Sequence, residues 1–347
     1  MKSLTCGVVI YDELALLQAF IPNLQAELQN INVEWIFVLN HKSSATRDIV
    51  KRWLQTQFTN QVILENPTNN LGQARQLILT TAQNKYIYFT DPDIELIPKS
   101  VQLLISSLNN KPEVLGAGGP VLHQSKNVML QKTFDCCHSL SKLFPFSFQM
   151  QAHTTNKSVD HIPTCHLLLH RKKALALGGF SILFAKYGED LDFSHRACVS
   201  GLPFLFYVDA PVYHHQHVTF AQWLKKMFSF GRVQIYTQRF YLKLAFRWYR
   251  LLPAGILILG FVFILAFPTL GLCVLALLAF VSLIVRGFIG VLMTALVYAA
   301  GELFELALPL FELQNALIPP AAKSNLLVAP VLSKKNIAAK LPEPDAS

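Results

Sequence analysis

Two aspartates, Asp91 and Asp93, follow directly after an apolar and aromatic run in the stretch YIYFTDPDIELIP, residues 86–98. In an extended chain residues i and i+2 face the same side, and Pro92 keeps Asp91 extended. The two carboxylates therefore face one point, where they repel each other unless a cation lies between them. Hard oxygen ligands suit Mn²⁺ or Mg²⁺, and Mg²⁺ usually takes further ligands from substrate phosphates. The pair predicts a divalent metal site, and the alternative is a plain turn or a helix cap.

A second acidic cluster lies in YGEDLDFSHR, residues 187–196. Gly201 marks the end of a predicted helix over about 189–200. Glu189 and Asp190 fall in the first turn of this helix, where the helix dipole favours negative charge. A carboxylate that stays ionised there can accept a proton, so Asp190 is a candidate general base. The alternative is that both acids only complement the helix N-terminus.

Strands alternate with helices over about the first hundred residues, which predicts a mostly parallel α/β sheet in three layers. The expected strands are 4–10, 33–39, 62–66 and 85–90, and the expected helices are 13–29, one that ends near Trp53, and one that follows NNLGQAR. Ligands of such sheets bind beyond the carboxyl ends of the strands. Because Asp91 follows the fourth strand, both aspartates are expected at that edge.

The chain resembles a family 2 glycosyltransferase with the GT-A fold, an α/β fold for nucleotide-diphospho-sugars. The motifs that carry the resemblance occur in the order of the family: NNLGQAR at 69–75, DPD at 91–93, GAGGP at 116–120, LGGF at 177–180, YGEDLDFSHR at 187–196 and VYHHQH at 212–217. The family is inverting, uses nucleotide-activated sugars and needs a divalent metal. The resemblance therefore implies the same activity here, with Mn²⁺ or Mg²⁺.

The resemblance also implies roles for individual residues. Asp91 would help to place the ribose and the metal, and Asp93 would ligate the metal. Asp190 would be the general base, with Glu189 near the acceptor. The other implied roles are donor binding by Asn70, Gly72 and Arg75, an acceptor side formed by Gly178, Gly179 and Phe180, and a metal ligand from His214, with His215 and His217 as alternatives.

Two departures from the family pattern bear on the substrate. Leu39 or Asn40 stands where the family commonly has an aspartate that reads the base, so uracil recognition through a carboxylate is not implied. The QxxRW pattern of processive synthases is missing, because Leu244 occupies the glutamine position before Arg247 and Trp248. This second departure favours transfer of a single sugar.

The C-terminal half has a different composition. The whole chain is 52% hydrophobic and 15% charged, and residues 251–285 contain no charge. One helix of that length would measure about 52 Å, against a hydrocarbon core of about 30 Å. We therefore predict two transmembrane spans that turn near Pro268 and Gly271, with a buried hairpin of a soluble core as the alternative. Glu302 and Glu305 would be costly at mid-membrane, so the next segment is a third span, a re-entrant hairpin or an interfacial helix.

Basic and aromatic residues interleave over 220–250, which is typical of an amphipathic helix at a membrane interface. Nucleic-acid binding could use a similar composition, but the adjoining predicted spans disfavour it. The N-terminus lacks the features of a signal peptide. We expect a multi-pass protein of the inner membrane, with its catalytic domain in the cytoplasm. The predicted organisation is a catalytic domain over 1–218, an interfacial segment over 219–250, a membrane region over 251–318 and a flexible basic tail over 319–347.

The predicted function is inverting transfer from a nucleoside-diphosphate sugar to an acceptor hydroxyl at the membrane surface, in glycan or glycolipid synthesis. The acceptor would be lipid-linked or a glycan. The alternatives are a polyprenyl-phosphate glycosyltransferase and an inactive membrane-bound binding module. The six cysteines lack disulfide-framework or zinc-ribbon spacing and are expected to be reduced. A structural zinc is a minor alternative at the cluster His161, Cys165, His166 and His170.

Overall fold

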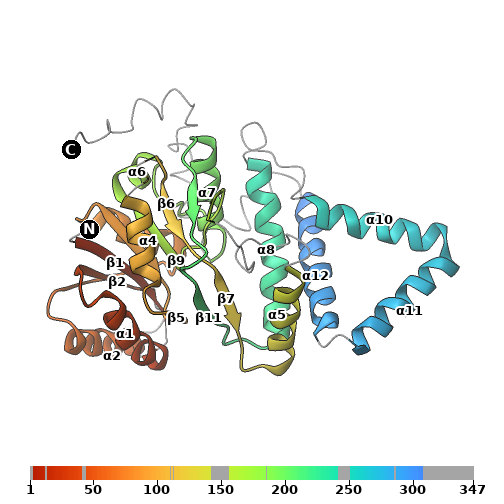
Figure 1. The fold of residues 1–347 in the computed structure, drawn as a ribbon, viewed down its shortest axis with the longest axis horizontal. Coiled ribbons are helices and arrows are strands. Elements are labelled where there is room, and N and C mark those ends of the chain that lie inside the picture. The colour runs from red at the N-terminus through yellow and green to blue at the C-terminus, as the bar shows by residue number, and fades with distance from the viewer. Residues whose placement is uncertain are drawn as a thin grey trace. The chain divides into compact units, whose positions relative to one another are not determined.

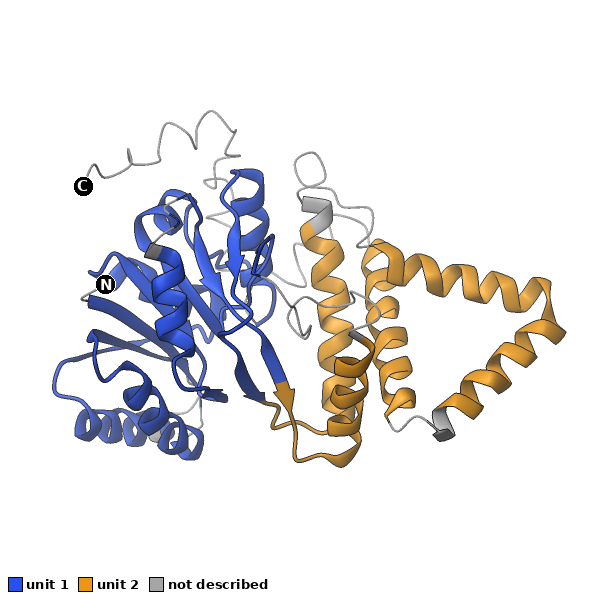
Figure 2. Ribbon diagram, viewed as in Figure 1, with its two compact units in different colours: residues 1–122, 153–214, 313–347 blue, residues 123–152, 215–312 orange. Residues whose placement is uncertain are grey.

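The structure is a computed structural model that divides into two compact units (Figure 2). The described residues are 3–11, 14–40, 44–109, 111, 113–141, 156–184, 186–240, 251–284 and 287–307. The first unit comprises 1–122, 153–214 and 313–347, and the second comprises 123–152 and 215–312. The predictions for Leu244, Arg247, Trp248 and the basic tail lie outside the described residues.

An eight-stranded sheet forms the centre of the described part of the first unit, in the order β3-β2-β1-β4-β9-β6-β10-β8. Its strands are β1 (Ser3–Ile10), β2 (Asn32–Leu39), β3 (Gln61–Glu65), β4 (Tyr86–Thr90), β6 (Gly116–Gly118), β8 (Lys157–Val159), β9 (His166–His170) and β10 (Phe204–Phe206). Strands β1 to β4 pair in parallel, whereas β9 lies antiparallel to both β4 and β6. The mostly parallel sheet that the sequence predicts is thus confirmed.

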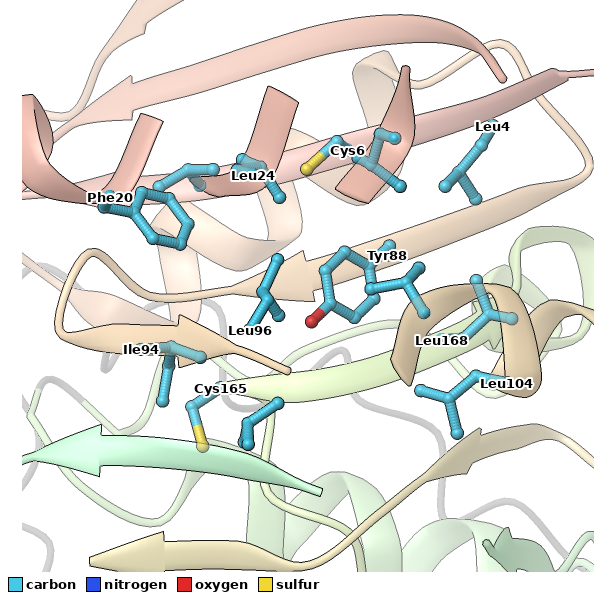
Figure 3. Close-up of a cluster of buried hydrophobic side chains, with 14 of the residues drawn as sticks. Leu4, Cys6, Phe20, Leu24, Tyr88, Ile94, Leu96, Leu104, Cys165 and Leu168 are labelled. Atoms are coloured by element: carbon cyan, nitrogen blue, oxygen red, sulfur yellow. The ribbon is translucent and has the colours of Figure 1, made fainter. Parts of the chain in front are cut away.

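Helices cover both faces of this sheet and give the three predicted layers (Figure 1). Helices α1 (Leu14–Leu28), α2 (Ser44–Gln57) and α4 (Ser100–Asn109) pack on one face, and α3 (Leu71–Thr81), α6 (Arg171–Ala176) and α7 (Glu189–Val199) on the other. Successive strand residues point to opposite faces, so Cys6 and Val8 of β1 join the first core and Val9 the second. Figure 3 shows the first core, with Cys6 of β1 beside Leu24 of α1 and Leu168 of β9 beside Leu104 of α4.

A smaller three-stranded sheet has the order β5-β11-β7. It consists of β5 (Ile94–Leu96), β11 (Val212–His215) and β7 (Val121–Gln124). Strands β11 and β5 are antiparallel, with His214 opposite Ile94. Because β5 begins one residue after Asp93, this register brings His214 next to the predicted metal-binding acids.

The described helices of the second unit are α5 (Val128–Ser141), α8 (Phe220–Phe240), α10 (Leu252–Ala266), α11 (Pro268–Ile284) and α12 (Phe288–Ala307). Helices α5 and α8 share a small apolar cluster formed by Leu130, Phe134, Trp223 and Met227. This packing groups residues 123–152 with the C-terminal helices. The structural division therefore differs from the continuous domain 1–218 expected from the sequence, because α5 finds its apolar partners far along the chain.

The apolar C-terminal helices differ in length. Helices α10 and α11 have 15 and 17 residues and meet at Phe267 and Pro268, where the sequence predicts a turn. Among the described residues, only α12 is both long and apolar enough to cross a membrane. The crossing of a membrane by α10 and α11 stays a prediction.

Two acids of α12 are fully buried inside the second unit. The Oε2 atom of Glu305 lies 3.0 Å from Nε of Arg232 on α8. The Oε2 atom of Glu302 accepts a hydrogen bond of 2.9 Å from the backbone N–H of Ala254, in the first turn of α10. Both carboxylates, which the sequence left without partners, thus bind other helices of the same unit.

Candidate active site

The loop between β4 and β5 carries the two aspartates to the edge of the main sheet. Strand β4 is buried along its whole length, whereas the side chains of Asp91 and Asp93 keep 26% and 31% of their surface exposed. Parallel α/β sheets bind ligands at the carboxyl ends of their strands. The apolar strand therefore holds the loop in place, and its charged end remains open to a ligand.

His214 meets the second of these aspartates. Its Nε2 lies 2.9 Å from Oδ2 of Asp93, although the two residues are 121 positions apart in the chain. The antiparallel pairing of β11 with β5 produces this contact. The other two candidate histidines, His215 and His217, lie in the second unit with ring centroids 6.3 Å apart.

Arg75 links the aspartate loop to the second acidic cluster. Its Nη2 lies 3.4 Å from both carboxylate oxygens of Asp91, and its Nη1 contacts Oε1 of Glu189. The side chains of Arg75 and Glu189 are almost fully buried. Three predicted site residues, which come from α3, from the end of β4 and from α7, are thus joined through one guanidinium group.

The charge balance at Asp91 reflects these neighbours. Burial is the largest influence and raises the pKa of the Asp91 carboxyl, and Arg75 opposes it by favouring the charged form. The negative charge of Asp93 raises the pKa of Asp91 again, and His214 lowers it. The two carboxylates therefore destabilise each other in their charged forms, as expected where a cation would bind between them.

Asp190 lies in the first turn of α7 and is half-buried. Its Oδ1 accepts a hydrogen bond of 2.8 Å from the backbone N–H of Leu191. Burial raises the pKa of the Cys165 thiol, and the charges of Asp91, Asp93 and Asp190 raise it further.

The next acid on α7 has a different environment. The side chain of Asp192 is nearly buried and pairs with Arg196 at 2.7 Å, one turn along the helix. Arg196 also donates from Nη1 to the carbonyl oxygen of Leu177, at 2.7 Å. This pair fastens α7 to the end of α6, and it offers a matched control for Asp190.

Two predicted donor-binding residues have structural roles at the start of α3. The Oδ1 of Asn70 accepts from the N–H of Gln73 at 2.9 Å and caps the helix, and its Nδ2 donates to the carbonyl of Ile182 at 2.7 Å. A Cβ at Gly72 would overlap the carbonyl oxygen of Ser181. Both residues therefore dock α3 against the loop that precedes α7, and their contact with a donor stays a prediction.

The predicted acceptor-side residues form a turn after α6. Gly178 and Gly179 have φ angles of 89° and 68°, in the left-handed region that favours glycine. The N–H of Phe180 donates to Oε1 of Gln76 at 2.8 Å, and its ring packs on Phe193 with centroids 4.7 Å apart. The Phe180 side chain lies in the core, and contact of this turn with an acceptor stays a prediction.

The residues present are consistent with a divalent cation held partly by substrate. Among the described side chains, no three from His, Cys, Asp and Glu gather into a complete metal site. Asp93 and His214 offer one carboxylate oxygen and one imidazole nitrogen in contact, and such ligands suit first-row divalent metals. Diphosphate oxygens would have to complete the coordination, as is usual for Mg²⁺ sites at phosphates.

The alternative of a structural zinc finds no support in the described residues. His166 lies between the hydroxyl of Tyr88, at 2.8 Å, and the carbonyl oxygen of Ala210, at 2.9 Å. Burial lowers the pKa of His166 to about 4. His161 contacts Oγ of Ser194 at 2.9 Å, so these two histidines have separate protein partners.

Asn66 follows β3 at the same edge of the sheet and is absent from the site residues that the sequence predicts. Its Nδ2 donates to Oδ1 of Asn40 and to the carbonyl oxygen of Asn70, both at 2.7 Å. Asn40, which stands where the family commonly has an aspartate, is therefore held by a neighbouring strand end. The position of Asn66 after a strand was the signal that could have identified it.

Comparisons with known proteins agree with this geometry. Residues 5–175 match the family model described as Glycosyl transferase family 2. The chain also resembles the solved structure "Mannosyltransferase PcManGT from Pyrobaculum calidifontis in complex with GDP-Man and Mn2+", with a TM-score of 0.59, 16% identity, and coverage of 88% of this chain and 87% of that chain. The fold is thus the GT-A fold of glycosyltransferases. The match to the family 2 model covers just under half of the chain.

Two further solved structures have weaker similarity. One is "Crystal structure of GalNAc-T7 with UDP, GalNAc and Mn2+" (TM-score 0.48, 11% identity, 67% of this chain and 47% of that chain). The other is "Crystal structure of S. aureus TarS" (TM-score 0.47, 12% identity, 71% of this chain and 41% of that chain). The chain thus spans about half the length of the first and less of the second. A sequence search of curated proteins finds no match.

Proposed function

We propose that the protein transfers a single sugar, with inversion, from a nucleoside-diphosphate sugar to a hydroxyl of an acceptor at a membrane surface. The observation that carries this proposal is the contact of His214 with Asp93, beside the Arg75–Asp91 pair, at the carboxyl edge of the sheet. The likeness in fold to a mannosyltransferase in complex with GDP-Man and Mn²⁺ supports the same class of donor and cofactor.

The donor binds across the strand ends. Asp93 and His214 would hold Mn²⁺ or Mg²⁺, and the bound ion supplies positive charge that stabilises the departing diphosphate. Arg75 favours the charged form of Asp91 and holds its carboxylate, which would help to place the ribose. In this arrangement Asp91 and Asp93 act on the donor, and the acids of α7 act on the acceptor.

Asp190 acts as the general base. It takes the proton of the acceptor hydroxyl as that oxygen attacks C1 of the sugar, on the face opposite to the diphosphate. The new C1–O bond forms while the bond from C1 to the diphosphate oxygen breaks, so the configuration at C1 inverts. A positioned general base typically contributes about 10²–10⁴-fold to the rate.

Glu189 is better described as a positioning residue than as a group that contacts the acceptor. Its carboxylate is buried against Arg75, which itself reaches Asp91. Through this chain of contacts Glu189 fixes the orientation of both Asp91 and the first turn of α7. This role replaces the catalytic role that the sequence suggested for it.

Replacement of the base tests the proposal. Asp190→Asn should lower the transfer rate by at least about 100-fold, while the affinity for donor and Mn²⁺ in calorimetry stays within a few-fold of the wild type. Asp192→Asn, the matched control one half-turn away on α7, should retain transfer because its amide oxygen can still accept from Arg196. Normal turnover in Asp190→Asn would refute the assignment.

The donor half of the site needs a separate measurement. Asp93→Ala should abolish the part of donor affinity that depends on Mn²⁺, and His214→Ala should weaken it in the same direction. An unchanged metal dependence in Asp93→Ala would overturn the donor site. If the wild type neither transfers nor hydrolyses any donor with any divalent metal, the chain is a binding module instead.

A further inference from the structure

The hairpin formed by α10 and α11 exposes apolar side chains along both helices. Leu259 of α10 is 70% exposed and Leu277 of α11 is 59% exposed, and most other large side chains of the hairpin are exposed as well. Neither helix contains a charged residue. Soluble monomers rarely expose an apolar patch of this extent, so the hairpin requires an apolar environment.

Helix α12 has one apolar exposed face and one buried face. Four of its exposed large side chains, Ile289, Met293, Leu296 and Phe304, recur at helical spacing, and Leu306 is exposed near its C-terminal end. The face opposite to the four carries Glu302 and Glu305, which are buried. A helix with this division has the pattern of an amphipathic helix that lies along an interface, apart from the two acids, whose Oε2 atoms contact other helices of the unit.

Helix α12 cannot enter a bilayer without α8. A Cβ at Gly231 would meet the backbone of Tyr298, and a Cβ at Gly301 would meet the backbone of Phe228, so the two helices touch closely. The ion pair of Arg232 with Glu305 joins them as well. Helix α8 also carries Lys225 and Lys226, and lysine is strongly disfavoured at the bilayer centre.

The hairpin is also short for two full crossings. Helices of 15 and 17 residues measure about 22 and 26 Å, against about 30 Å of hydrocarbon. Within the second unit α10 and α11 diverge from their turn toward opposite ends of α12 (Figure 1), so both ends of the hairpin return to the side on which α12 lies. Two N–H groups of the turn are bonded, since Phe267 donates to Phe263 and Gly271 to Phe267, and Pro268 has no N–H.

We propose that the second unit binds one leaflet of a lipid bilayer as a monotopic anchor. The α10–α11 hairpin enters the hydrocarbon and returns to the same face, while α8 and α12 lie along the surface with the apolar stripe of α12 toward the lipid. Glu302, which caps the first turn of α10 through Ala254, fixes the angle at which the hairpin leaves the surface. This arrangement replaces the two predicted spans.

Cysteine labelling tests the topology. The full chain, with Thr269→Cys at the turn or Ser229→Cys on α8, is reconstituted in vesicles of equal parts phosphatidylcholine and phosphatidylglycerol. A membrane-impermeant maleimide is supplied outside, or trapped inside, and the labelling of the wild-type thiols is subtracted. We expect Thr269→Cys to stay unlabelled from both faces until detergent is added, and Ser229→Cys to react directly.

Each other result contradicts the proposal. Labelling of Thr269→Cys from the face opposite to Ser229→Cys would mean that α10 and α11 cross the bilayer. Labelling of both positions from one face would mean that the hairpin stays in water. Because the expected result is the same for either orientation in the vesicle, a mixed population does not blur the outcome.

A charge substitution tests the lipid contact independently. The pair Leu259→Lys and Leu277→Lys changes exposed side chains, so the fold in detergent should persist, as circular dichroism can verify. Flotation with the same vesicles should fall at least about ten-fold. The control places the same two lysines at Ala221 and Gln222, exposed positions on α8, and should float like the wild type. Undiminished flotation of the hairpin variant would overturn the proposal.

Discussion

A buried arginine–glutamate pair occurs in each unit, and the two pairs differ in what lies beyond them. In the first unit Arg75 contacts the buried Glu189 and also reaches Asp91, which remains open to a ligand. In the second unit Arg232, 21% exposed, joins the fully buried Glu305 and holds α8 to α12. Buried ion pairs bring little net stability because both charges lose their hydration. The Arg75–Glu189 pair therefore serves the candidate active site, whereas the Arg232–Glu305 pair holds two helices together.

The largest expected effect comes from Arg75→Met. Removing the guanidinium leaves Glu189 as an unpaired buried charge, which should lower the free energy of unfolding by about 3–5 kcal/mol. Transfer should fall at least about 100-fold, because Asp91 also loses its partner. Denaturant unfolding and a donor-turnover assay measure the two effects.

A double variant sharpens this prediction. Arg75→Met with Glu189→Leu removes both charges, and such apolar replacements are often neutral or stabilising. We expect stability to return and transfer to remain lost. Recovery of transfer in the double variant would mean that the pair serves only the fold, and the contrast between the two units would disappear.

Arg232→Met should have a similar effect on stability and none on chemistry. Glu305 would remain buried without its partner, at a cost of about 3 kcal/mol, near the lower limit because Arg232 is partly exposed. Hydrogen exchange in α8 and α12 should accelerate, while the turnover per folded molecule stays at the wild-type value. A loss of turnover with intact exchange protection would contradict this assignment.

The sequence predicted the elements around the site better than the contacts within it. The apolar run YIYFT and the Asp-Pro-Asp turn are local features of the chain, so strand β4 and the open acids after it could be predicted. The contact of His214 with Asp93 depends on the register of β11 against β5, which no local pattern encodes. The family resemblance, and not the spacing, singled out His214.

The two arginine–glutamate pairs are further contacts that could not be predicted from local sequence. Nothing near Arg75 in the chain indicates Glu189, and nothing near Arg232 indicates Glu305, because each partner comes from a distant helix. Glu302 and Glu305 would be energetically costly in a membrane only if α12 were surrounded by lipid on all sides. Their burial against α8 and α10 accounts for them, and it is what makes an interfacial position of α12 the better interpretation.

The pH dependence of stability tests the effect of burying His166, which belongs to the first unit. Burial lowers the pKa of His166 to about 4, from an ordinary value of 6.5. The unfolded chain therefore binds the proton first as pH falls, and the native state loses stability between about pH 6.5 and pH 4. The loss should reach about 3 kcal/mol at pH 4.

Hydrogen exchange, which reports each segment separately, can measure this loss in β9 and compare it with α12. His166→Gln should flatten the pH dependence in β9 without changing that of α12. An unaltered pH dependence in the variant would show that other groups in the first unit carry the acid sensitivity.

The smallest expected effect concerns the helix caps, which also differ between the units. Asn70 caps α3 from the adjoining residue, whereas Glu302 caps α10 from a distant helix. Asn70→Ala removes both the cap and the bond to Ile182, and should cost about 1–2 kcal/mol. Asn70→Asp keeps an oxygen for the cap and loses only the donor to Ile182, so about half of that cost should remain.

Turnover distinguishes what the bond to Ile182 does. The loop that contains Ile182 leads into α7, and a loosened loop would misplace Asp190 even where the cap persists. We therefore expect Asn70→Asp to lose activity by a few-fold with little loss of stability. If Asn70→Asp unfolds and turns over like the wild type, the bond to Ile182 does not position the loop, and the contacts of α7 with Arg75 and with Leu177 must position the general base.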